Sequence, residues 1–428
     1  MKEGGRLNLI VLSLAVLLVF LAPVILGCAP QTAAPSSSQP STPAAKEKVK
    51  IVVGSVVNAT GAYASTQIIQ QYAETDYIKW VNETGYIPGV ELEYRWADSA
   101  SDTGKALPAF KQVIGASPKP TVVLIGSPSN GVALKSSVTD AKITSIISSG
   151  DNLIIRPPEY YFATGLPQCN EVGVFINWFA KNWKENRPAK FAWLTWDTVF
   201  GRAFVNKETE AYIKSKGIEI VGAEYIPAVP TDTTAHILRL KDAKVDVTYG
   251  GFYPPAVTVL LKDADKLGLW GKFVFGNSYQ LSLTDVIKLA GPLSEGIVQS
   301  GYFTPPTWME EKCPWILEQY KKNNRDVDMW AYAATAGPVV CAVEAIKQTV
   351  NEVGAENTNT AALYKTLSKL TNFDMRGIFV APVTFTESNR AGVSGEVVFQ
   401  IKDGKIIALE PFAKSPDLLP GGKDVPAQ

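Results

Sequence analysis

The chain has 428 residues, of which 46% are apolar and 19% are charged, and its 41 basic residues are balanced by 41 acidic ones. That length is enough for two or three ordinary domains, and the apolar share is typical of a soluble globular protein with a substantial core. The balanced charge and the lack of a basic cluster argue against a nucleic-acid partner.

The N-terminal segment has a charged start, an apolar middle and a small-residue end. An apolar run over 9–21 is followed closely by Ile25-Leu26-Gly27-Cys28. This order predicts a secretory signal over residues 1–27 that is not part of the fold. The last four residues also resemble the lipobox of bacterial lipoproteins, which implies cleavage before Cys28 and a lipid on its thiol. The alternative is a plain transmembrane anchor over 7–27, because about 20 apolar residues span a bilayer.

The next segment has a composition that does not support a packed core. Residues 29–45 are rich in Pro, Ser, Thr and Ala and carry no charge and no aromatic ring. Such a segment buries too little apolar surface to offset the entropy of ordering it. We therefore expect residues 28–47 to be a disordered, lipidated tether. A low-complexity binding tail is the alternative.

Strands and helices alternate over the first part of the globular region. We expect strands at 49–57, 90–96, 121–125 and 143–147, a helix with apolar positions Ile69, Ala73, Tyr77, Trp80 and Val81, and a second helix ending near Gly115. In the second strand Val90, Leu92, Tyr94 and Trp96 alternate with charged residues, which predicts one buried face. The alternation predicts a parallel sheet with helices on both faces.

A second unit of similar build follows Phe162–Pro167. We expect strands at 190–195, 218–225, 245–250 and 272–275, with helices at 200–216, after Thr231 and after Pro254. Helices dominate from 308 to 370. The end is β-like, with a strand at 383–385 and a hairpin whose arms are 395–399 and 406–409, turning around Lys402-Asp403-Gly404.

Few residues suit catalysis or metal binding. The cysteines other than Cys28 are Cys169, Cys313 and Cys341, and one pair of them could form a disulfide. No CxxC or CxxH spacing predicts a zinc site. The single histidine, His236, has no partner histidine or cysteine nearby and no G-x-S-x-G motif accompanies it. We therefore expect no catalytic residue, no metal and no cofactor, and a protein that is not an enzyme.

Loops after the predicted strands are the expected ligand site, since ligands of open α/β sheets bind at the carboxyl ends of the strands. These loops are 58–63, 127–130, 148–152, 196–200, 251–253 and 276–279. They are rich in small, polar and aromatic groups, which suit reversible capture of a small polar solute.

Several short stretches in a fixed order resemble one known family. They are Thr60–Ala64, Ala97–Asp102, Gly126–Ser129, Phe162–Thr164, Val245–Pro254 and Ala264–Gly268. The chain is similar along nearly its whole mature length to the extracytoplasmic solute-binding proteins of branched-chain-amino-acid-type ABC transporters, such as leucine-binding proteins. The resemblance implies the type I periplasmic-binding fold, in which two Rossmann-like α/β lobes with parallel central sheets are joined by a hinge of crossing strands.

The resemblance also implies a mechanism and partners. The lobes close on one solute because the ligand contacts both of them only in the closed form, and the closed form delivers it to ABC permease subunits. The strands would cross near Thr164, Ser300 and Gly377. The N-terminal lobe would then comprise 48–164 plus 301–376, the C-terminal lobe 165–300 plus 377–412, and the tail 413–428. We expect a monomer held at the outer face of the cell membrane by the lipid on Cys28.

The resemblance assigns ligand-binding roles to particular positions. In the family, hydroxyls and backbone amides of the first lobe hold the ligand carboxylate, and aromatic rings of the second lobe close over it. The positions that match, or that lie in the matching loops, are Tyr63, Ser129, Gly150, Asp151, Asn152, Phe200, Phe252, Asn277 and Ser278.

One departure from the family bears on the ligand. The family usually holds the ligand ammonium with an acid in the loop after the fourth strand of the second unit, but Gly276-Asn277-Ser278-Tyr279 contains no acid. A buried ammonium without a counter-charge is costly. Either Asp151 supplies the charge, or the solute is an amide, an aromatic or aliphatic carboxylate, or a neutral compound. Arg156 is close enough in sequence to pair with Asp151 instead.

Two other functions compete with transport. Similar lobes occur in ligand-sensing receptors, so a binding domain that senses a small amide or aromatic acid is the alternative. A secreted hydrolase would need a nucleophile, a base and an orienting group, and these residues do not assemble in the sequence.

Overall fold

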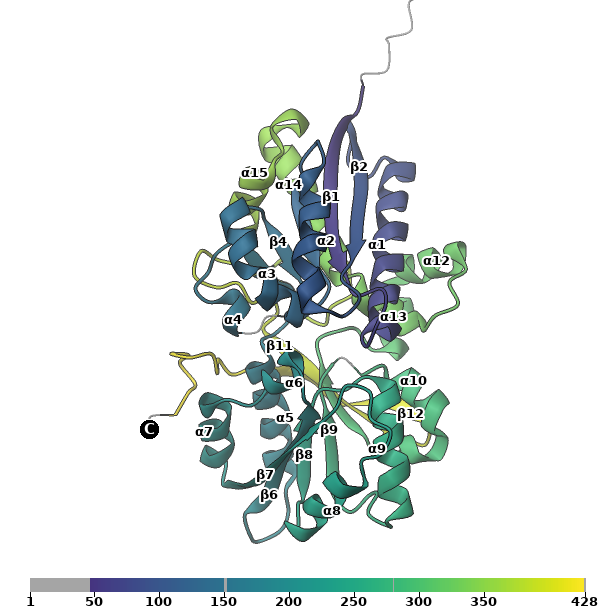
Figure 1. Ribbon diagram of the computed structural model, residues 1–428, viewed down its shortest axis with the longest axis vertical. Coiled ribbons are helices and arrows are strands. Elements are labelled where there is room, and N and C mark those ends of the chain that lie inside the picture. The colour runs from purple at the N-terminus through teal and green to yellow at the C-terminus, as the bar shows by residue number, and fades with distance from the viewer. Residues whose placement is uncertain (1–46, 150–151, 280, 427–428) are drawn as a thin grey trace, which may run out of the picture. The chain divides into compact units, whose positions relative to one another are not determined.

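The computed structural model describes residues 47–149, 152–279 and 281–426. The predicted signal, Cys28, Gly150 and Asp151 lie outside these residues. The chain from Glu47 onward forms one compact unit that contains two β-sheets, each flanked by helices (Figure 1).

The first sheet consists of five parallel strands in the order β2-β1-β3-β4-β5. The strands are β1 (Val49–Val57), β2 (Val90–Asp98), β3 (Val122–Ile125), β4 (Ser145–Ile147) and β5 (Tyr161–Ala163). They are connected by α1 (Ala64–Thr84), α2 (Thr103–Gly115), α3 (Pro128–Ala141) and α4 (Asn152–Ile155). The order confirms the expected strand–helix alternation in this part of the chain.

Both faces of this sheet are buried, as parallel sheets require. Along β3, Val123 and Ile125 belong to the core that α2 and α3 share, whereas Val122 and Leu124 belong to the core formed with α1. Successive side chains of a strand point to opposite faces, so one apolar run supplies both cores. Trp96 was expected on a buried face, but it is 40% exposed, because β2 is an edge strand and Trp96 lies near its end.

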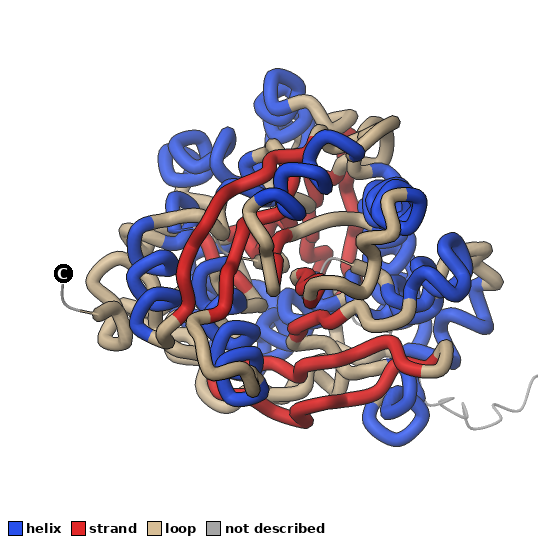
Figure 2. Tube along the Cα trace, turned by 90° about the horizontal axis from the view of Figure 1, so that it is seen from below, coloured by secondary structure: helices blue, strands red, loops and turns tan. Residues whose placement is uncertain are grey.

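The second sheet has seven strands in the order β12-β11-β10-β9-β8-β6-β7. The strands are β6 (Ala189–Trp196), β7 (Ile218–Ile226), β8 (Val247–Gly250), β9 (Val274–Asn277), β10 (Val298–Gly301), β11 (Gly395–Lys402) and β12 (Lys405–Lys414). Strand β11 runs antiparallel to both of its neighbours, β10 and β12, and the other pairs of the sheet are parallel. Its helices are α5 (Gln168–Asn182), α6 (Val199–Arg202), α7 (Lys207–Ser215), α8 (Thr234–Asp242), α9 (Pro254–Lys266) and α10 (Leu283–Ala290), with a 3-10 turn at Gly291–Ser294. Figure 2 shows helices covering the strands of both sheets.

The predicted hairpin is confirmed by the antiparallel pairing of β11 with β12. Its two-residue turn has φ of 52° at Asp403 and 65° at Gly404. A turn with positive φ at both central residues matches the twist of the flanking strands and favours an Asp-Gly pair.

A helical segment follows β10 in sequence and returns to the first sheet. It contains α11 (Met309–Lys312), α12 (Pro314–Asn323), α13 (Met329–Thr335), α14 (Gly337–Val353) and α15 (Thr360–Leu367), with 3-10 turns at Pro306–Trp308 and Ala355–Asn357. Helices α12, α13 and α14 contact α1, and α14 also contacts β3 and β4. This packing covers the face of the first sheet opposite α2 and α3 (Figure 1).

The connections between the two sheets run side by side. The Ala163 N–H donates to the Arg390 carbonyl and the Gly392 N–H donates to the Ala163 carbonyl, both at 2.8 Å. The Thr304 N–H donates to the Ile378 carbonyl, also at 2.8 Å. Thr164 follows β5 directly, Ser300 lies in β10 and Gly377 lies in the loop after α15. The lobe boundaries drawn at these positions stay a prediction.

Two expected elements differ from the structure. The helix expected over 200–216 is divided into α6 and α7, because Asn206 starts a new helix: its Oδ1 accepts the Thr209 N–H at 2.9 Å in a capping box. The strand expected over 383–385 is wrong, because Val383 makes only an isolated bridge to Phe373.

No single helix among the described residues is long and apolar enough to cross a bilayer, and only the bent pair α13 and α14 passes the same test together. Cys169, Cys313 and Cys341 are buried thiols and no disulfide joins them.

Candidate ligand-binding site

Loops from the carboxyl ends of both sheets meet around one small pocket. From the first sheet it is lined by Tyr63 and Gln67 after β1, by Gly126–Ser129 after β3 and by Ser148 after β4. From the second sheet it is lined by Trp196 and Phe200 after β6 and Tyr253 after β8. The pocket therefore lies where open α/β sheets bind ligands.

The first-sheet wall is rigid and rich in hydrogen-bond donors. Ser127 is the N-cap of α3, and its hydroxyl accepts the Asn130 N–H at 3.2 Å and the Asn58 side-chain amide at 2.9 Å. The Asn130 side chain donates in turn to the Ser99 hydroxyl at 2.8 Å. Buried bonds of this kind fix the loop. They place Ser129, in the first turn of α3, at the pocket. Its hydroxyl, its N–H group and the positive end of the helix dipole favour a negatively charged ligand group.

The second-sheet wall is aromatic. The Trp196 and Tyr253 rings pack edge to face with centroids 4.9 Å apart. Tyr63, from the first-sheet side, lies 6.2 Å from each of them. Such ring pairs stabilise one another beyond the area that they bury. The two walls of the pocket are therefore in direct contact through Tyr63.

The pocket is small in this structure. Its volume is about 20 Å³, and about 10–15 Å³ is needed for one water molecule. A larger ligand therefore enters only if the two walls move apart.

The structure brings together three of the residues that the family resemblance pointed to. Tyr63, Ser129 and Phe200 all line the pocket. Ser127, Ser148 and Tyr253, which also line it, lie in loops expected to hold the ligand but were not among the individual positions assigned to it, and Gln67 lies outside those loops. Ser148 and Tyr253 could have been identified from their positions in the loops that follow β4 and β8.

Phe252 is not among the lining residues. Its side chain is fully buried, 6.1 Å from the Trp196 ring and 6.2 Å from the Phe275 ring. Its neighbour Tyr253, the N-cap residue of α9, occupies the pocket wall instead. The chain turns into α9 directly after this dipeptide, so one ring faces the core and the other faces the pocket.

Asn277 and Ser278 lie behind the pocket and are fully buried. The Asn277 Oδ1 accepts the Phe252 N–H at 3.1 Å and the Ser278 N–H at 2.9 Å, so this side chain holds two loops together. Among the described residues the Asn277 Nδ2 has no hydrogen-bond partner. Asn152 begins α4, whereas Gly150 and Asp151 lie outside the described residues. The Arg156 guanidinium, which the sequence offers as an alternative ion-pair partner for Asp151, donates to the Pro420 carbonyl at 3.1 Å.

A pair of buried glutamates is a feature that sequence reasoning missed. Glu171 in the first turn of α5 and Glu396 in β11 are both fully buried, and within the described part of the chain none of their carboxyl oxygens lies at hydrogen-bonding geometry to a partner. Burial raises the pKa of Glu171 well above its usual range, and the charge of Glu396 raises it further, against a small lowering by the Ser278 hydroxyl. Burial likewise raises the pKa of Glu396 to about 8. The loop that lacks an acid in the sequence therefore has a carboxyl beside it in space.

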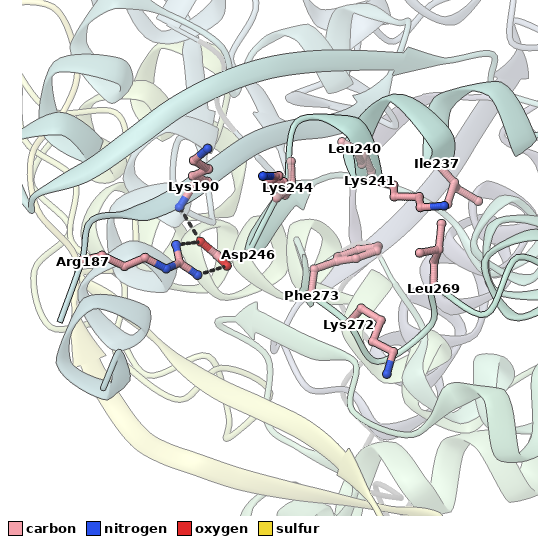
Figure 3. A pocket seen from close by; sticks show the side chains of 11 residues that line it. Arg187, Lys190, Ile237, Leu240, Lys241, Lys244, Asp246, Leu269, Lys272 and Phe273 are labelled. Carbon is pink, nitrogen blue, oxygen red and sulfur yellow. Dashed lines mark hydrogen bonds and ion pairs between the residues drawn. The ribbon is translucent and has the colours of Figure 1, made fainter. Parts of the chain in front are cut away.

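A wider hollow of about 470 Å³ lies at the amino ends of β6, β8 and β9, away from the loops described above (Figure 3). Lysines line it, and Asp246 binds the Arg187 guanidinium through two bonds of 2.7 Å (Figure 3). Asp246 also accepts the Lys190 N–H at 2.8 Å, so its role is to join the starts of two strands. Ligands of open α/β sheets bind at the other end of the strands, so this hollow is not the solute site.

The single histidine is part of a surface ion-pair group. His236 on α8 lies 2.7 Å from Glu224, which also accepts from Arg239 at 2.6 Å. Within the described ranges no group of three or more His, Cys, Asp or Glu side chains could hold a metal ion.

Comparison with known proteins gives consistent results. The sequence profile described as periplasmic binding protein matches residues 50–405. A Leu/Ile/Val-binding protein homolog of Brucella melitensis is 24% identical over 367 residues, which are 84% of this chain and 94% of the relative. A leucine-, isoleucine-, valine-, threonine- and alanine-binding protein of Pseudomonas aeruginosa is 27% identical over 301 residues, 66% of this chain and 73% of the relative.

Solved structures share the fold. A branched-chain amino acid ABC transporter protein from Thermus thermophilus with bound valine has a TM-score of 0.78 at 22% identity and covers 86% of this chain and 97% of its own. A fatty acid ABC transporter substrate-binding protein from Thermomonospora curvata has a TM-score of 0.75 at 18% identity, covering 89% and 97%. These neighbours confirm the expected α/β fold with parallel central sheets. The chain belongs to the periplasmic binding protein family, whose members bind solutes for transporters outside the cytoplasm and are not enzymes.

Proposed function

We propose that this protein is the substrate-binding component of an ABC importer, which captures a small polar solute between two lobes and delivers it to the permease. The observation that carries the proposal is the pocket lined by loops from the carboxyl ends of both sheets. A ligand there contacts both walls only when they are close together, so its binding energy favours the closed form. The permease recognises that closed form.

The two walls suit different parts of one ligand. The Ser127–Ser129 segment offers hydroxyls and the N-terminus of α3, which favour a carboxylate or another acceptor group. Trp196, Phe200 and Tyr253 offer ring faces and edges to an apolar part. An amino acid or a related amide or carboxylate fits this division, and Leu/Ile/Val-binding relatives support it.

We propose two alternative classes of solute for this pocket. In the first, the solute is an α-amino acid and Asp151 supplies the charge that holds its ammonium group. In the second, the solute has no ammonium group, and the polar residues around Asn277 and Ser278 meet an amide or a carboxylic acid.

The proposal also includes a lipid anchor and the residue ranges of the two lobes. Cleavage before Cys28 and a lipid on its thiol would hold a monomer at the membrane through the tether 28–47. The lobes would comprise 48–164 plus 301–376 and 165–300 plus 377–412. Incorporation of labelled palmitate that is lost in Cys28→Ser tests the anchor, whereas equal labelling of the two forms contradicts it.

A thermal-shift panel of amino acids, amides and aromatic or aliphatic acids tests the function. A ligand that binds only the folded protein raises the midpoint by an amount that grows with its concentration above Kd. We expect at least one class to stabilise the wild type, and Ser129→Ala to lose that effect. Ser136→Ala, an exposed serine on the same helix, is the matched control. If no solute of the panel stabilises the protein, the proposal fails.

A further inference from the structure

A second cavity lies beside the ligand pocket. Its volume is about 140 Å³, and it shares Gln67 and Ser148 with the pocket described above. The α9 N-cap residue Tyr253 lines the ligand pocket and the next residue, Pro254, lines the second cavity. The two spaces are therefore neighbours, and the second one also lies between elements of the two sheets, with α1 and α13 on one side and α9 and α10 on the other.

Most of the second cavity is apolar. Its apolar wall is formed by Ile69, Pro254, Phe303, Trp330, Ala331 and Ala334. The Trp330 indole N–H donates to the Thr304 carbonyl at 2.9 Å, so the hydrogen-bonding group of that ring already has a partner.

Three polar side chains of this cavity have partners within the protein. The Gln70 amide donates to Glu74 at 2.8 Å, the Thr335 hydroxyl donates to the Ala331 carbonyl at 2.8 Å, and Asp285 lies 3.6 Å from the Lys288 ammonium. The Tyr279 hydroxyl, which also lines the cavity, has no partner among the described residues. Most of the wall is nevertheless apolar, so the cavity is suited to an apolar ligand group.

The size of the cavity indicates how large that apolar group is. A protein cavity of about 150 Å³ lined by aliphatic and aromatic side chains binds benzene. A cavity of about 140 Å³ therefore has room for one six-membered ring or an alkyl chain of similar volume. This exceeds the side chain of valine or leucine.

Gln67 stands between the two spaces and can move. It is buried, and among the described residues its Oε1 has no hydrogen-bond partner, while its Nε2 makes one bond of 3.2 Å to Gln70. Its amide lies against the bare backbone of Gly126, where any side chain would come within 2.1 Å of the Gln67 Oε1. Few bonds hold this amide in place, so a ligand that fills both spaces needs only to turn it aside.

We propose that the second cavity binds the apolar end of the solute, so that the ligand is a carboxylate or amide that carries a ring or chain of about six carbons. The polar end occupies the pocket at Ser127–Ser129 and the apolar end passes Gln67 to lie between Ile69 and Trp330. This inference rests on the proposed function and specifies the substrate class of the same site.

Calorimetric titration with 3-phenylpropanoate tests the inference. Ala334→Leu fills the cavity from α13, Thr335→Leu fills it from a half-buried position that tolerates the larger side chain, and Ala133→Leu adds the same bulk to an exposed position of α3 as control. We expect the wild type and Ala133→Leu to bind this ligand equally. We expect Ala334→Leu and Thr335→Leu to bind it at least tenfold more weakly, with unchanged circular dichroism and thermal midpoint confirming that each is folded.

The contrary outcomes separate this inference from the proposed function. Undiminished binding by the two filled variants overturns the cavity assignment. Binding of leucine but not of 3-phenylpropanoate by the wild type overturns the ligand class and leaves the importer function standing. Binding of no solute at all overturns both.

Discussion

The buried carboxyl pair makes the stability of this protein sensitive to alkaline pH. Glu396→Gln keeps the shape of the side chain and removes its titration. The groups that face the pair are the hydroxyls of Ser278, Ser300, Tyr249, Tyr279 and Tyr302, and no basic side chain among the described residues contributes to the pKa of either glutamate. No positive charge therefore stabilises the ionised carboxylates, and the folded state favours the protonated, neutral carboxyls.

The sign and size of the effect follow from linkage. The pKa of Glu396 is raised from 4.5 to about 8 in the folded protein. The stability that this carboxyl contributes is complete at a pH below its pKa in the unfolded chain. That contribution is lost as the pH rises through its pKa in the folded protein. One extra bound proton costs ~1.4 kcal/mol for each pH unit in that window, and the proton is half lost at pH 8, so the loss between pH 6 and 8 is about 2.3 kcal/mol.

Calorimetric scans from pH 6 to 9 measure this loss. About 2.1 cal/mol/K per residue over the roughly 380 residues from Glu47 onward gives an unfolding entropy of about 0.8 kcal/mol/K. The wild-type midpoint should therefore fall by about 3 °C between pH 6 and 8 more than the midpoint of Glu396→Gln does. Glu219→Gln, which removes an exposed carboxyl from β7, should follow the wild type. Equal pH profiles for wild type and Glu396→Gln would refute the assignment of a raised pKa to this pair.

Three further predictions separate structural from ligand-binding roles. Phe252→Ala should cost about 3–5 kcal/mol of unfolding free energy in urea titrations because it leaves a cavity in the core, and a loss below 1 kcal/mol contradicts its burial. Asn277→Ala should cost about 1–3 kcal/mol, since the Phe252 and Ser278 N–H groups lose their buried acceptor, and Asn277→Asp should retain more stability than Asn277→Ala. Ser127→Ala should lose about 1 kcal/mol as an N-cap and also weaken solute binding, whereas Asn359→Ala, which removes the N-cap of α15, should lose stability alone; equal affinities in the two variants would exclude a role for the α3 terminus.

Much of the fold could be predicted because its signals are local. The apolar runs of β1 and β3, the Gly85 end of α1 and the Asp403-Gly404 turn each depend on neighbouring residues. The division of 199–215 into two helices was missed because the helical spacing was followed past the Asn206 cap. Residues 383–385 would form a strand only if another strand paired with them. The local sequence pattern does not predict that pairing.

The site was predictable only as far as topology determines it. The strand ends indicated the loops that line this pocket, and Tyr63, Ser129 and Phe200 lie at it. The choice between Phe252 and Tyr253 depends on how the chain turns into α9, which spacing alone does not determine. Gln67 is one more residue of a long helix in the sequence, and Glu171 and Glu396 are brought together only by packing of α5 against β11.

Solute capture between the two walls is tested most directly by calorimetric titration of a double variant. Ser129→Ala with Phe200→Ala removes one contact from each wall of the pocket, and Ser136→Ala serves as control. For the solute that stabilises the wild type most, we expect the double variant to bind at least a hundredfold more weakly, or ~2.7 kcal/mol, and the control to bind as the wild type does. An unchanged affinity in a folded double variant would contradict solute capture at this pocket.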